Sequence, residues 1–122
     1  MAYTEEDKKY ILNQHLRNIS GIGDKEYQKK VWIRGEGPEV DDFDETVCYF
    51  FDNGDHILEN YQDYKITESQ YNILKNFRDE FESFNDGDHR PYLPEEFIDT
   101  PEWEKIMNMA KEVLKAFDYQ KK

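Results

Sequence analysis

Residues 46–61 carry the sequence TVCYFFDNGDHILENY, the segment from which we predict the fold. Two runs rich in β-branched and aromatic residues flank Asp52-Asn53-Gly54-Asp55, and Asn-Gly accepts the positive φ angles of a two-residue type I′ turn. The pattern therefore predicts a β-hairpin over residues 46–61. In that register the better core face carries Val47, Tyr49, Phe51 and Leu58, and the opposite face is a mixed one of Cys48, Phe50, Ile57, Glu59 and Tyr61.

On the N-terminal side of this segment the sequence predicts a helix and a strand. Thr4 with Asp7 is typical of a helix start, and apolar residues then recur at helical spacing, so we expect a helix over residues 4–18 that the glycines of residues 20–24 end. Val31-Trp32-Ile33, bounded by Gly35, predicts a strand within residues 27–34.

On the C-terminal side the sequence predicts two helices. Thr67 and Gln70 form a capping box that starts the first, and Thr100 followed by Pro101 starts the second. One helical turn is expected at residues 95–97. The order helix, strand, strand, strand, helix, helix predicts a single α+β domain over residues 1–122, with a small antiparallel sheet of about three strands, the 46–61 hairpin at its centre, packed by about three helices.

Negative charge is concentrated in residues 36–64. The chain has 28 acidic and 16 basic residues, which gives a formal net charge of −12. Ten of the acids lie within residues 36–64, where no Lys or Arg occurs, so 18 acids face 16 bases in the rest of the chain. Charge of one sign in one place raises the local potential, and the asymmetry predicts a surface that attracts a cationic partner.

We expect the partner-binding surface to combine the acidic loop of residues 35–45 with the mixed hairpin face, where aromatic anchors lie beside acids. Two other interpretations stay open: the acids of the loop only keep the protein soluble, and a helix covers the mixed face. The expected contact residues are Glu36, Glu39, Asp41, Asp42, Asp44, Glu45, Phe50, Asp55, Ile57, Glu59, Tyr61 and Asp63.

The sequence shows no catalytic or metal-binding motif. The hairpin register places Cys48 and His56 on opposite faces, so we expect Cys48 to be a small apolar filler rather than a nucleophile. His15 is expected to be a packed histidine with satisfied hydrogen bonds, and His89 has no partner at a defined spacing. Neither the 36–45 loop nor residues 85–89 match the spacing of an EF-hand. We therefore predict a protein that is not an enzyme and that holds no metal or cofactor.

The composition predicts a cytoplasmic protein. Cys48 is the only cysteine, the N-terminus is acidic without an apolar stretch, and no apolar run approaches the roughly 18 residues of a membrane helix. A sequence pI of about 4.6 disfavours direct binding to nucleic acid or to anionic lipid, because phosphates repel it.

These features favour a small acidic protein that occludes a basic site on a protein partner, such as the nucleic-acid site of a nuclease. In size and charge, though in no shared motif, the chain resembles the small acidic immunity proteins that neutralise bacterial toxins, and also phage-type nucleic-acid mimics. That resemblance implies an inhibitor of a nuclease-type toxin. The alternative is a non-catalytic accessory or structural subunit that assembles through its hairpin.

Overall fold

The computed structural model describes residues 3–36, 42–86 and 94–119, and within these residues every element is a helix and none is a strand. The predicted α+β fold with its three-stranded sheet is therefore wrong. The elements are α1 (Glu5–Ile22), α2 (Lys25–Tyr27), the π-helix η1 (Gln28–Ile33), α3 (Phe43–Glu59), α4 (Glu68–Asp86), α5 (Pro94–Phe97) and α6 (Pro101–Ala116).

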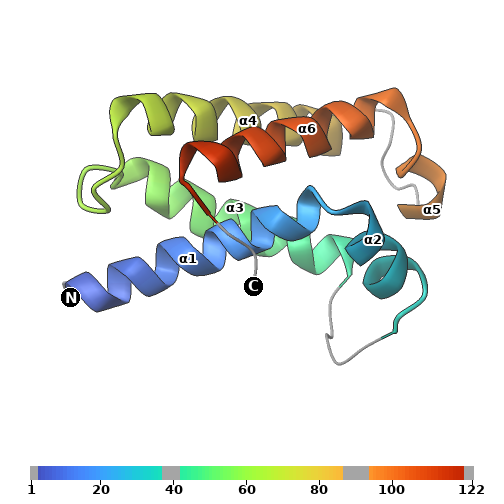
Figure 1. Ribbon diagram of the computed structural model, residues 1–122, viewed down its shortest axis with the longest axis horizontal. Helices are drawn as coiled ribbons and strands as arrows, with labels where there is room; N and C mark the ends of the chain where they lie inside the picture. The colour runs from blue at the N-terminus through green and yellow to red at the C-terminus, as the bar shows by residue number, and fades with distance from the viewer. Residues whose placement is uncertain (1–2, 37–41, 87–93, 120–122) are drawn as a thin grey trace.

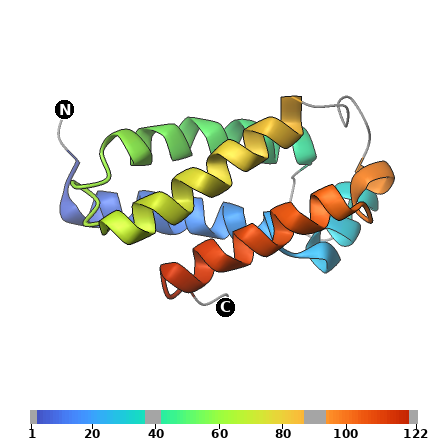
Figure 2. The ribbon, with the colours of Figure 1, turned by 90° about the horizontal axis from the view of Figure 1, so that it is seen from above.

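The four long helices form an antiparallel bundle (Figure 1). Helices α4 and α6 lie side by side in one layer, and α1 and α3 in the other, with contacts that run from α1 to α3, α3 to α4, α4 to α6 and α6 back to α1. Seen from above, α3 and α6 lie at opposite edges (Figure 2). The outer side of α3 consequently faces away from α6.

Most of the predicted hairpin lies inside α3: residues 46–59 continue a helix that begins at Phe43, and residues 60 and 61 belong to the turn after it. The buried residues recur three or four apart and form one helical face, which the division into two strands conceals. Gly54 is buried on this face, and a Cβ there would lie 3.1 Å from Cε1 of His15 in α1. The glycine therefore permits a close approach between helices, not a turn. The buried residues of α3 are Phe43, Thr46, Val47, Phe50, Gly54 and Ile57.

The predicted strand at residues 27–34 is also wrong, because Tyr27 ends α2, residues 28–33 form η1 and Arg34 caps the end of η1. Val31 and Trp32 are consecutive and both buried, as in a strand that is covered on both faces, but here a short π-helix carries them into the core. Gln28 of the same π-helix is fully buried, and its amide donates to the carbonyls of Gly21 and Ile22 while its oxygen accepts from Nε1 of Trp103.

The predicted helix starts are confirmed. Thr4 and Asp7 form a capping box at α1, which continues to Ile22 rather than ending near residue 18. Thr67 and Gln70 exchange the same pair of hydrogen bonds at α4. The hydroxyl of Thr100 accepts from the backbone of Trp103 at α6, and the turn expected at residues 95–97 is α5.

Candidate partner-binding surface

Helix α3 carries an acidic line along its outer side. Asp42 caps the helix, because its carboxylate accepts a hydrogen bond from the backbone N–H of Glu45 at 2.8 Å. Residues seven apart on an α-helix lie about 20° apart around the axis and roughly 10 Å apart along it. The exposed acids Glu45, Asp52 and Glu59 have this spacing. We call these three residues the α3 ridge.

No described Lys or Arg compensates the negative charge of the α3 ridge. Glu45, Asp52 and Glu59 are exposed, and none of them forms an ion pair with a Lys or Arg in the described parts of the chain. Tyr49 lies between the first two acids in sequence and has 42% of its surface exposed. The outer side of α3 therefore offers an uncompensated line of carboxylates with one large aromatic side chain beside it.

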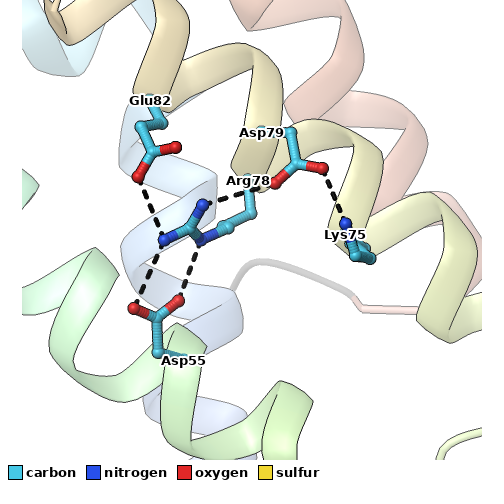
Figure 3. A network of polar contacts seen from close by, with 5 residues as sticks. All are labelled: Asp55, Lys75, Arg78, Asp79 and Glu82. Atoms are coloured by element: carbon cyan, nitrogen blue, oxygen red, sulfur yellow. Dashed lines mark hydrogen bonds and ion pairs between the residues drawn. The ribbon is translucent and has the colours of Figure 1, made fainter.

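Asp55, unlike the acids of the α3 ridge, is paired with a cation. Its carboxylate accepts from Nε of Arg78 at 2.8 Å and from Nη2 at 3.4 Å, so α3 is joined to α4. Arg78 also contacts Glu82 at 3.1 Å and Asp79 at 3.3 Å (Figure 3). Its guanidinium lies 5.3 Å from the centre of the Phe51 ring, and the hydrogen bond to Asp55 raises the pKa of Arg78 further above its ordinary value. Asp55 belongs to a contact between helices, with its charge balanced.

The two apolar residues of the predicted surface lie in the core. Phe50 and Ile57 have no exposed surface, and Phe50 packs at 5.1 Å against the ring of His15 and at 5.2 Å against that of Phe81. Tyr61 is half-buried, with its ring 4.4 Å from that of Tyr71. A partner at the outer side of α3 does not reach Phe50 or Ile57, since both point inward.

In sequence, the remaining predicted contact residues come before α3, in its first turn and after its end. Glu36 is exposed and pairs with Arg34 at 3.0 Å, Asp44 is exposed in the first turn of α3, and Asp63 is exposed in the turn that follows the helix. Glu39 and Asp41 lie outside the described residues. Of the twelve predicted residues, Glu45 and Glu59 belong to the α3 ridge.

The sequence interpretation missed Asp52, which lies at the centre of the α3 ridge. Its spacing of seven residues from both Glu45 and Glu59 is visible in the sequence, but a helical stripe has meaning only once the segment is known to be helical. Cys48 was expected to be an apolar filler and is instead exposed on the outer side of α3. The predicted hairpin register places Cys48 on one face of a sheet, whereas the residue lies on a helix.

Elsewhere in the described residues we note one hollow and one hydrogen bond between side chains. A shallow hollow of about 400 Å³ lies on α6. His56 Nε2 and the Tyr64 hydroxyl share a hydrogen bond of 2.7 Å, and burial raises the pKa of Tyr64.

Residues 3–36, 42–86 and 94–119 contain no group of three or more potential ligands placed to hold a metal ion. The same residues include no helix with the length and apolar content of a membrane span.

Comparisons of the chain with protein-family models, with curated proteins and with solved structures find no significant match.

Proposed function

We propose that this chain is a non-catalytic acidic protein that binds a basic site on another protein through the α3 ridge. The observation that carries the proposal is the line formed by Glu45, Asp52 and Glu59, which no described Lys or Arg neutralises. Carboxylates placed roughly 10 Å apart on one rigid helix present their charge in a fixed arrangement. Such a surface attracts a cationic partner before contact and orients it during approach.

The partner that suits this surface is a protein with a basic groove, such as the nucleic-acid site of a nuclease-type toxin. The carboxylates would take the place of phosphates, and Tyr49 would supply apolar contact area with a hydroxyl at its tip. Inhibition would follow from occlusion of the groove. The alternative function, assembly through a hairpin, lacks the element that it requires, because residues 46–61 lie in α3 and in the turn after it.

The first experiment identifies the partner and its dependence on charge. The purified chain is used to capture proteins from a lysate of its source cell at low and high salt, and the captured protein is then produced pure. We expect a basic protein whose capture is lost at high salt, because salt screens exposed charges beyond roughly 10 Å at 0.1 M.

The second experiment assigns the binding to the α3 ridge. Association rates of the purified partner are measured at low salt with the triple variant Glu45→Lys, Asp52→Lys, Glu59→Lys and with the matched control Glu102→Lys, Glu104→Lys, Glu112→Lys on α6. Both variants change the net charge equally. We expect the ridge variant to associate at least about tenfold more slowly than the control. Equal rates for the two variants would contradict the proposal.

A further inference from the structure

His15 occupies an unusual place for a titratable side chain. It lies on the inner side of α1, has no exposed surface, and contacts α3 through the stacked ring of Phe50 at 5.1 Å. Neither ring nitrogen has a hydrogen-bond partner among the described residues. The expectation of a satisfied histidine was therefore wrong in this respect, although the residue is packed as predicted.

Helix α3 carries a glycine where the ring of His15 packs against it. Gly54 of α3 lies against it, and a Cβ on that glycine would come within 3.3 Å of Nε2. A side chain at residue 54 would require the ring to shift by a few tenths of an ångström, so the packing between α1 and α3 brings the imidazole close to a glycine. A neutral ring fits this apolar site, whereas a charged ring would lack both water and a hydrogen-bond acceptor.

The charged groups around the ring do little to accommodate a proton. From α3, Asp55 is the carboxylate that acts on His15, and Arg78 of α4 holds that carboxylate at 2.8 Å. No other titratable group of the described parts of α1, α3, α4 or α6 acts on the ring. Because Arg78 already pairs with Asp55, the negative charge of Asp55 does little to stabilise a protonated His15.

We propose that His15 is an acid-sensitive switch in the packing of α1 against α3: the two helices stay together while the ring is neutral, and its protonation forces the ring out and separates them. Separation would expose the apolar inner faces of both helices, on which the bundle depends. The inference does not depend on the proposed function.

The direction of the pH dependence follows from proton binding. Burial lowers the pKa of His15 from 6.5 to about 4 in the folded protein, so the unfolded chain binds the proton more tightly. Above pH 6.5 the burial of the neutral His15 ring does not lower the free energy of unfolding. As the pH falls from 6.5 toward 4, proton binding by the unfolded chain lowers it. Between pH 7.5 and pH 5 the folding equilibrium constant should fall about 30-fold through His15 alone.

The test measures unfolding by denaturant between pH 7.5 and pH 5 in the full chain and in the variants His15→Gln and His15→Phe, neither of which titrates. Carboxylates stay largely ionised in this range. We expect the roughly 30-fold decrease in the wild-type protein and little decrease in either variant. The control His56→Gln, which removes a histidine of the opposite side of α3, should keep the decrease. An unchanged pH dependence in the His15 variants would overturn the proposal.

A second measurement does not depend on the variants being folded. The Cε1 proton of His15 is followed by NMR in the wild-type protein as the pH is lowered. We expect it to keep its neutral chemical shift in the folded state and to change only as the signals of the α1–α3 contact disappear. Titration of the ring at any pH without loss of those signals would show that the ring accepts a proton in place, and would refute the switch.

Discussion

At the scale of single residues, Gly54 determines how α1 and α3 fit together. Glycine in the middle of a helix costs about 1 kcal/mol relative to alanine, so its presence there requires a compensating contact. That contact is the ring of His15, which approaches the position of the missing Cβ to 3.1 Å. Real Cβ atoms hardly ever come closer, and the buried ring has little room to move.

Gly54→Ala should therefore destabilise the protein by about 1–3 kcal/mol, because the cost of the crowded ring exceeds the gain in helix propensity. The informative comparison is the same substitution in a His15→Ala background. There the crowding is absent, and the added methyl group should stabilise the protein by about 1 kcal/mol. Denaturant unfolding of the four proteins measures both effects. A stabilising Gly54→Ala in the presence of His15 would show that the ring is not confined.

At the scale of elements, the helix ends were predictable and the middle of the chain was not. The capping interactions of Thr4, Thr67 and Thr100 each join residues three apart, so the local sequence contains the whole signal. The Asn53-Gly54 pair is also a local signal, but its meaning depends on His15 in another helix. A glycine required by a turn and one required by a neighbouring helix look the same in one sequence.

An ion pair between α3 and α4 also holds these two helices together, and no local sequence pattern predicts it. Arg78 of α4 forms an ion pair with Asp55 of α3 (Figure 3). Its guanidinium also lies 5.3 Å from the centre of the Phe51 ring. The Arg78 side chain is mostly buried and Asp55 is about half exposed, so the pair is only partly shielded from solvent. Its contribution should be modest and sensitive to salt.

Arg78→Met should cost about 1–2 kcal/mol, from the ion pair and from the contact with the aromatic ring together. Lys75→Met is the matched control, since it removes the same charge from α4 but breaks an ion pair with Asp79 that lies within that helix. The control should cost no more than about 0.5 kcal/mol. Unfolding at two salt concentrations measures both, and equal costs would mean that Arg78 does not join α3 to α4.

At the scale of the whole molecule, most large apolar side chains of the described residues lie inside, and none of the described Asp, Glu, Lys or Arg residues is buried. The core combines aromatic side chains from several elements, among them Trp32, Phe43, Phe81 and Trp103, whose rings lie within about 6 Å of one another in successive pairs. The prominence of aromatic residues in the core was predictable from composition. The location of the charge was predictable too, but its division into the α3 ridge, the capping Asp42 and the paired Asp55 required the fold.

The surplus of negative charge should make the stability of the molecule increase with salt. A net charge of −12 repels itself, and the ion pairs of the described residues are exposed at least on one side, so screening removes more repulsion than attraction. We expect the melting temperature to rise by a few degrees between 10 mM and 300 mM NaCl. The same salt should weaken association with a basic partner, so the two effects have opposite signs.

The α3 ridge should account for a disproportionate part of this repulsion. No described Lys or Arg forms an ion pair with its acids, whereas Glu102 and Glu112 of α6 lie three residues before Lys105 and Lys115, on the same side of that helix. The triple variant Glu45→Gln, Asp52→Asn, Glu59→Gln should melt at a higher temperature than the wild-type protein at 10 mM NaCl and respond less to added salt. Neutralising Glu102, Glu104 and Glu112 changes the net charge by the same amount but also removes attraction to those lysines, so it should raise the melting temperature less. Identical behaviour of the two variants would mean that only the total charge matters and that the line along α3 has no electrostatic character of its own.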